Sequence, residues 1–141
     1  MSSIADEIKR SGYIVQPTVG SSMEPMLHNR RSVVYIKRTD EILKPLDLPL
    51  YLRPSGTYVL HRILKVDTKR AEYIICGDNC WRSERVPFDW VLGIVEEYQC
   101  DGVKHTVKDT DYLEYLKTLP MRRLKLTVKG ILQIIKHKIL K

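Results

Sequence analysis

Along the first hundred residues, apolar and β-branched positions come in short runs that are separated by glycine, proline and charged turns. Such runs predict strands, and they cover residues 13–19, 32–37, 57–66, 71–76, 90–99 and 103–107. The charged turn at 67–70 and the pair Asp101-Gly102 each indicate a β-hairpin. The pattern therefore predicts a mainly β fold, a coiled antiparallel sheet or barrel-like domain.

The two ends of the chain follow a helical pattern instead. A short helix is expected from a serine cap near the N-terminus to about Arg10, with Gly12 as its stop. Beyond residue 109 the apolar spacing changes to three and four residues. This spacing predicts a helix over 111–119, an interruption at Pro120, and a second helix over 121–140.

The helical extension, residues 111–141, differs in charge from the predicted domain at 1–110. The chain of 141 residues carries 24 Lys+Arg and 17 Asp+Glu, yet residues 117–141 hold eight of the basic residues and no acidic one. The apolar residues of this tail fall on one helical face: Leu124, Val128, Ile131, Leu132, Ile135 and Ile139. A basic tail on a near-neutral body indicates an anionic partner and argues against a nucleic-acid-binding domain.

Several partners fit such a helix. Its apolar stripe can pack on the domain or on a second copy, which would give a homodimer. It can also make peripheral contact with an anionic membrane, or bind an acidic peptide. No window reaches the ~20 apolar residues of a membrane span, and no secretory signal opens the chain.

The cysteine count indicates a reducing compartment. Cys76, Cys80 and Cys100 form an odd set without a secretory signal, which is typical of free thiols in a cytoplasmic protein. Their spacing, with only isolated histidines nearby, does not indicate a zinc site. We therefore expect neither a metal nor an organic cofactor.

The most informative stretch runs from Val19 to Leu27 and reads VGSSMEPML. A turn of small residues can expose a serine hydroxyl and direct backbone N–H groups at a developing oxyanion. Taken alone, the stretch is more typical of serines, Ser21 and Ser22, that only cap a short helix over 23–27. Two further segments follow in order and change the interpretation: YVLHRI at 58–63 and CGDN at 76–79.

The three segments together resemble the signal-peptidase/SOS-repressor superfamily of serine peptidases, in its branch where histidine activates the serine. The resemblance covers roughly residues 13–98. It implies a signal-peptidase-type domain in which Ser22, the serine directly before methionine, is the nucleophile and His61 is the general base. Histidine suits this role because its ordinary pKa of ~6.5 leaves much of it neutral at pH 7. Asp78 would orient His61, or form a turn, or do both.

The same resemblance assigns the oxyanion-binding part of the site to the serine turn, at Gly20, Ser21 and Met23, with the backbone N–H of Ser22 as the principal donor. Signal peptidases usually carry a serine where this chain has Gly20, which can offer only its N–H. The chain also lacks the family's Gly-Asp pairs at 29–32 and 46–48. These departures affect loop geometry and substrate fit.

The sequence therefore predicts a small serine endopeptidase without a membrane anchor. It would hydrolyse a bond in a precursor or leader peptide in the cytoplasm, with peripheral contact at the inner membrane surface as an option for the tail. Two alternatives stay open. One is a catalytically inactive peptide-binding module of the same fold. The other is a self-cleaving regulator without its DNA-binding domain, for which the twelve residues before Tyr13 leave no room.

Overall fold

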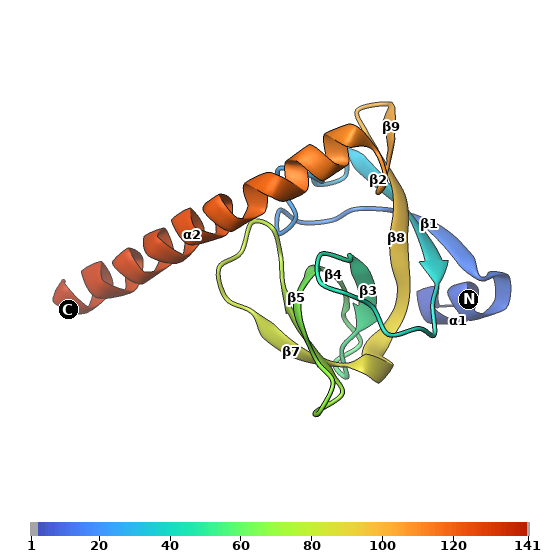
Figure 1. Ribbon diagram of the computed structural model, residues 1–141, viewed down its shortest axis with the longest axis horizontal. Coiled ribbons are helices and arrows are strands. Elements are labelled where there is room, and N and C mark those ends of the chain that lie inside the picture. Colours follow the sequence, from blue (N-terminus) through green and yellow to red (C-terminus); the bar gives the residue numbers. More distant parts are fainter. Residues whose placement is uncertain (1–2, 141) are drawn as a thin grey trace.

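The computed structural model describes residues 3–140, and Figure 1 shows a curled β-body from which one long helix projects. The larger sheet contains β1 (Tyr13–Pro17), β2 (Ser32–Arg38), β3 (Pro49–Leu52), β4 (Tyr58–Leu60), β8 (Val91–Cys100) and β9 (Val103–Thr106). The smaller sheet contains β5 (Arg62–Asp67), β6 (Glu72–Cys76) and β7 (Glu84–Pro87). The remaining elements are α1 (Ile4–Ser11), the short 3₁₀ helix η1 (Phe88–Trp90) and α2 (Thr110–Ile139).

Every strand pair is antiparallel, and the larger sheet is strongly curled. Its main path runs β1-β2-β8-β3-β4, with β9 beside β8. The expected mainly β architecture with a helix at each end is therefore confirmed. The path leaves β1 and β4 as the two edges of the curl, which is important for the site described below.

The stretch 57–66, expected as one strand, divides at His61. Strand β4 ends at Leu60 in the larger sheet, and β5 begins at Arg62 in the smaller one. Leu60 packs on the core between the larger sheet and α1, whereas Ile63 belongs to a second core under the smaller sheet. His61 therefore occupies the junction between two sheets and two cores.

Helix α1 follows the expected signals closely. The Ser3 hydroxyl accepts from the N–H of Asp6, and the Asp6 side chain accepts from the N–H of Ser3, which completes a capping box. Gly12 ends the helix at φ 76°, in the left-handed region that favours glycine. Ile8 is buried between the helix and the sheet.

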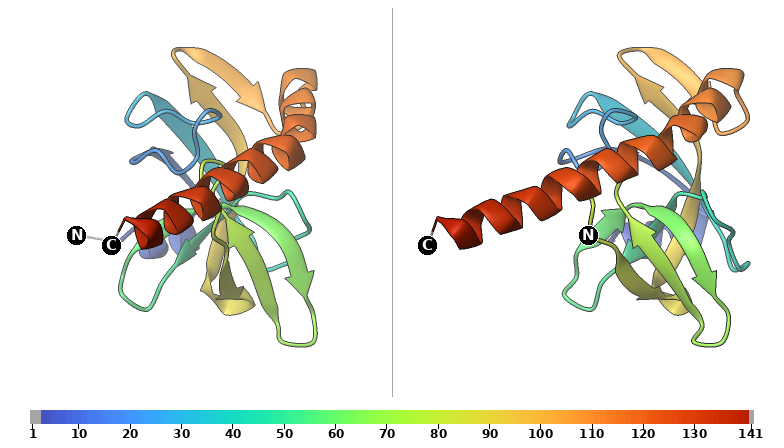
Figure 2. Two further views of the ribbon diagram at one scale, coloured as in Figure 1. Left: turned by 90° about the vertical axis from the view of Figure 1, so that its left-hand side faces the viewer. Right: turned by 60° about the vertical axis from the view of Figure 1, so that its left-hand side comes forward.

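The expectation of two C-terminal helices is wrong, because α2 continues through Pro120 as one helix of 30 residues. A proline inside a helix removes one hydrogen bond and favours a bend, and the left view of Figure 2 shows the axis changing direction after its first turns. Contacts on both sides of Pro120 hold the helix, since Leu119 is buried and Tyr115 and Arg122 both bind Asp78. No helix within residues 3–140 has the length and apolar character needed to cross a bilayer.

Candidate active site

Ser22 lies in the series of turns that connects β1 to β2. The Met23 side chain is 5% exposed and fixes the turn to the core. Two contacts join the turn to the segment after β6: the Asp78 N–H donates to Met23 Sδ at 3.3 Å, and the Asn79 N–H donates to the Ser22 carbonyl at 2.8 Å. Two of the three sequence segments are therefore held together by backbone N–H groups of the segment after β6.

The third segment brings His61 to Ser22. His61 Nε2 and Ser22 Oγ are 3.0 Å apart, within hydrogen-bonding distance. His61 is half-buried, and this burial lowers the pKa of the imidazole below its ordinary value, while the charge of Glu84 opposes the shift. A neutral imidazole at this distance can accept the hydroxyl proton and so activate Ser22 as a nucleophile.

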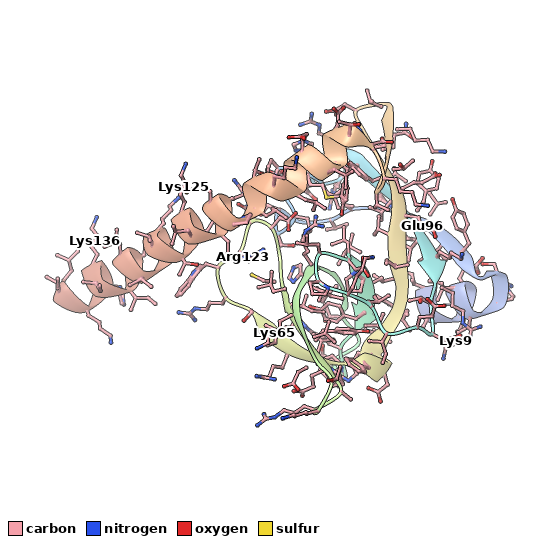
Figure 3. All side chains as sticks on the ribbon, in the orientation of Figure 1. Lys9, Lys65, Glu96, Arg123, Lys125 and Lys136 are labelled. Atoms are coloured by element: carbon pink, nitrogen blue, oxygen red, sulfur yellow. The ribbon has the colours of Figure 1, made fainter. Side chains whose placement is uncertain are left out.

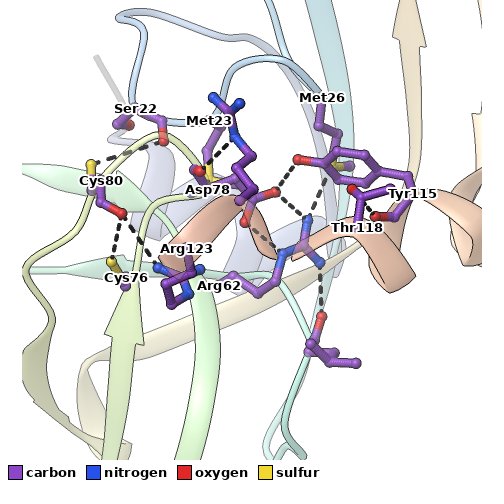
Figure 4. A network of polar contacts seen from close by, with 12 residues as sticks. Ser22, Met23, Met26, Arg62, Cys76, Asp78, Cys80, Tyr115, Thr118 and Arg123 are labelled. Carbon is purple, nitrogen blue, oxygen red and sulfur yellow. Dashed lines mark hydrogen bonds and ion pairs between the residues drawn. The ribbon is translucent and has the colours of Figure 1, made fainter. Parts of the chain in front are cut away.

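Asp78 makes its contacts away from His61. Arg62 Nε and Nη2 donate to the two Asp78 oxygens, each at 2.8 Å, and the Tyr115 hydroxyl donates to Oδ2 at 2.7 Å (Figure 4). Both side chains of the Arg62–Asp78 pair are 0% exposed. No hydrogen bond within residues 3–140 joins Asp78 to His61. The contacts therefore support a bracing role for the Asp78 side chain, and among the described residues they show neither a bond to its own backbone nor an orienting contact with His61.

The predicted oxyanion-binding residues differ in what they can donate. The N–H of Gly20 is occupied by Asn29 Oδ1 at 2.8 Å, so Gly20 is not a free donor. Ser21 is exposed, and its carbonyl accepts from Asn79 Nδ2 at 3.0 Å. The N–H groups of Ser22 and Met23 have no acceptor within residues 3–140, which leaves them as the donors available to an oxyanion.

Gly77 permits the close approach of Ser22 and His61. A Cβ at this position would lie 2.6 Å from the Ser22 carbonyl oxygen and 3.2 Å from His61 Cδ2. The first distance is shorter than any ordinary van der Waals contact. A glycine is therefore required where the segment after β6 passes behind the Ser22–His61 pair.

Helix α2 contributes residues that the sequence analysis did not place in the site. Arg122 donates to Asn79 Oδ1 at 2.7 Å, to the Asp78 carbonyl at 3.1 Å and to the Glu24 carbonyl at 3.2 Å. It therefore ties the serine turn and the Asp78 turn to one helix. The available signal was the choice of arginine at 122 and 123 in a tail whose other cations are lysines, because the guanidinium fork suits several acceptors at once.

Glu84 is a second residue that the sequence analysis did not place in the site. Glu84 of β7 accepts from the Tyr51 hydroxyl and from Arg53 Nη2, the latter at 2.7 Å. The charge of Glu84 raises the pKa of His61 more than that of Asp78 does, and Arg53 lowers it. Strand β7 was not expected from the sequence, so nothing marked this carboxylate as a neighbour of His61.

Ser22 and His61 both line a cavity of about 450 Å³, a size typical of ligand sites. Its walls come from both edges of the curled sheet, with Gln16 and Pro17 from β1 and Tyr58 from β4. The remaining lining is largely apolar and comes from residues such as Ile4, Met23, Val34, Ile36, Leu50 and Leu60. Ser22 and His61 therefore face an apolar recess between the two edge strands of the curled sheet.

The cysteines show no arrangement for chemistry. All three are free thiols, and burial raises the pKa of Cys76 and of Cys80. A raised pKa keeps a thiol protonated and unreactive at neutral pH. Within residues 3–140 there is no group of three His, Cys, Asp or Glu side chains placed to hold a metal ion.

Comparison of the chain with protein-family models, with curated proteins and with solved structures finds no match. The functional interpretation of Ser22 and His61 therefore depends on the ordered segments of the sequence and on the geometry of the site.

Proposed function

We propose that this protein is a serine endopeptidase of the signal-peptidase-like type. The observation that carries the proposal is the 3.0 Å separation of Ser22 Oγ and His61 Nε2 on the wall of an apolar cavity. A serine and a neutral histidine at this distance form the smallest set of side chains that supports acyl transfer. Two backbone N–H groups of the serine turn supply the accompanying oxyanion donors.

In the proposed reaction, Ser22 Oγ attacks the carbonyl carbon of a peptide bond while His61 Nε2 takes the hydroxyl proton. The negative charge that develops on the carbonyl oxygen is stabilised by the N–H groups of Ser22 and Met23. The C–N bond then breaks, and His61 returns the proton to the leaving amine, which leaves an ester on Ser22. Water, deprotonated by His61, hydrolyses this ester and restores the hydroxyl.

The sheet edges support an extended peptide as the substrate. Strands β1 and β4 end the curled sheet on its two sides, and both line the cavity. A peptide in extended conformation can pair with such an edge through its backbone and place side chains in the apolar recess. We infer a precursor or leader peptide as the substrate class. The free thiols support a reducing compartment such as the cytoplasm for the reaction.

The proposal is tested by labelling and by cleavage. The protein is incubated with a fluorophosphonate probe, which reacts with activated serines, and the labelled peptide is identified by mass spectrometry. We expect the label on Ser22, loss of labelling in Ser22→Ala and His61→Ala, and near-normal labelling in Ser21→Ala, the matched neighbouring serine. Cleavage of a diverse peptide mixture by the same set of variants then reports the preferred sequence around the cut.

The alternatives predict different results. An inactive peptide-binding module would bind peptides from the mixture but would neither be labelled nor cleave, even at high protein concentration. A self-cleaving regulator would cut its own chain, with little action on added peptides. Normal cleavage of a verified substrate by Ser22→Ala would remove this serine from the mechanism.

A further inference from the structure

The long helix α2 has two sides with different surroundings. One side docks on the body, where Tyr112 and Leu119 are buried and Gly130 packs against the indole of Trp81. The contact is so close that a Cβ on Gly130 would lie 2.3 Å from the indole ring. Arg123 also points to this side and donates to the Cys80 carbonyl at 3.4 Å, as seen between helix and body in Figure 3.

The other side of α2 carries an apolar stripe that nothing within residues 3–140 covers. Its members are 45 to 75% exposed and recur every three or four residues: Met121, Leu124, Val128, Ile131, Leu132, Ile135 and Ile139. At 1.5 Å per residue this α2 stripe is about 27 Å long. Beyond Gly130 the helix extends away from the body, and a continuous exposed apolar surface of this length indicates an interaction surface.

The charges beside the α2 stripe select among possible partners. Lys125 and Lys136 project outward from the helix in Figure 3, and with Lys129 they follow one border of the stripe. None of these three forms a salt bridge within residues 3–140, and residues 117–140 contain no carboxylate side chain. A second copy would bring an identical row of positive charges against the first, which opposes association. An anionic surface would neutralise the lysines while the stripe leaves water.

We propose that the α2 stripe binds the surface of an anionic phospholipid bilayer. The helix would lie in the plane of the membrane, with its apolar residues among the upper acyl chains and the lysine stems extending to the headgroups. Because Arg122 holds the Ser22 and Asp78 turns on the docked side of α2, the helix would lie between the bound membrane and these turns. The proposal depends on the surface of α2 alone and stands whether or not Ser22 cleaves peptides.

Binding is measured by flotation of the full chain with vesicles of phosphatidylcholine containing phosphatidylglycerol, and with vesicles of pure phosphatidylcholine. The Ser22→Ala protein is used throughout, so that cleavage does not enter the result. We expect binding to the anionic vesicles, much weaker binding to the neutral ones, and a loss of roughly tenfold or more in about 0.5 M salt, where surface charges are screened.

Two pairs of variants locate the surface. Leu124→Gln with Leu132→Gln removes apolar area at positions 57% and 59% exposed, and its control Ile42→Gln with Val103→Gln does so at positions 64% and 57% exposed on the body. Glutamine keeps helix propensity, so the helical signal should persist. We expect the first double variant to bind roughly tenfold more weakly or worse, and the control to bind normally.

A second comparison replaces lysines on α2 and, as a control, lysines on the body. Lys125→Glu with Lys129→Glu should weaken binding to anionic vesicles, whereas Lys65→Glu with Lys69→Glu on the β5–β6 hairpin should have little effect. Equal binding by the α2 variants and their controls would overturn the proposal. So would a lipid-free dimer in analytical ultracentrifugation that the Leu124→Gln, Leu132→Gln variant dissociates, because the stripe would then be covered by a second copy.

Discussion

His61 and Arg62 are neighbours in the chain, yet their contacts have opposite properties. His61 is half-buried, makes one hydrogen bond with Ser22, and opens onto a cavity. Arg62 is fully buried, and its guanidinium donates to Asp78, to the Leu46 carbonyl and to Tyr112. A side chain that has a free hydrogen-bonding atom and opens onto a cavity can react. A side chain whose N–H groups are all hydrogen-bonded can only support the structure. These contacts leave His61 open to the cavity and commit Arg62 to the structure.

The largest expected effect is a loss of activity when His61 is replaced. His61→Ala removes the proton acceptor of Ser22, so kcat/KM for a verified peptide should fall by about 10³-fold or more. The unfolding midpoint should change little, because His61 makes no structural ion pair. Steady-state kinetics and urea denaturation of the same preparation measure the two quantities. If His61→Ala lost stability in proportion to its activity, His61 would have a structural role like that of Arg62, which would contradict the comparison.

The second expected effect is a loss of stability when the buried Arg62–Asp78 pair is broken. Asp78→Asn leaves the buried Arg62 charge without its partner and should lower the free energy of unfolding by about 3–5 kcal/mol. The control is Asp101→Asn, which breaks the exposed pair with Arg31 and should leave the unfolding transition nearly unchanged. If Asp78→Asn instead lost activity at unchanged stability, Asp78 would belong with the catalytic residues.

A third variant tests whether the segment after β6, which contains Gly77, positions Ser22 and His61. Gly77→Ala places a methyl group against the Ser22 carbonyl and the edge of His61. A displacement of the pair by a fraction of an ångström should lower kcat by about 10- to 100-fold. Gly102→Ala in the β8–β9 turn serves as the control, since Gly102 is also in the left-handed region at φ 83° but its Cβ would meet open space, and it does not line the cavity. Its kcat should remain normal.

The smallest expected effect concerns pH. Burial lowers the pKa of His61, so the imidazole stays neutral at pH 7, and activity should fall only when the pH drops through a value below 6.5. Glu84→Gln removes the charge that opposes this shift and should move the acid limb of the kcat/KM profile to still lower pH. Glu114→Gln, on the exposed side of α2, should leave the limb in place. A profile that rises steeply above pH 9 would point to a lysine base.

Local signals in the sequence predicted most of the fold. The cap at Ser3 and the stop at Gly12 bound α1, and the Asp101-Gly102 turn joins β8 to β9, because each depends on a few adjacent residues. The pairing of Ser22 with His61 could also be anticipated, since the order of three short segments indicated it before any distance was known.

Long-range contacts explain what the sequence analysis missed. The local pattern predicts a helix break at Pro120, because the contacts of α2 with the Asp78 turn, more than 35 residues earlier in the chain, leave no local signal. The sequence allows Asp78 as a partner of His61, but Asp78 binds Arg62, the residue directly after that histidine. Glu84 was missed because the short strand β7 has only four residues and little apolar pattern.

The contacts of Arg122 make the bracing of the site a later event in synthesis than the emergence of the serine turn. This residue follows Glu24 by 98 positions, and it joins the serine turn to the Asp78 turn only after α2 has docked. A chain still emerging from the ribosome can form its sheets before that connection exists. The serine turn and the Asp78 turn can therefore be braced only after α2 has been made, 98 residues after Glu24.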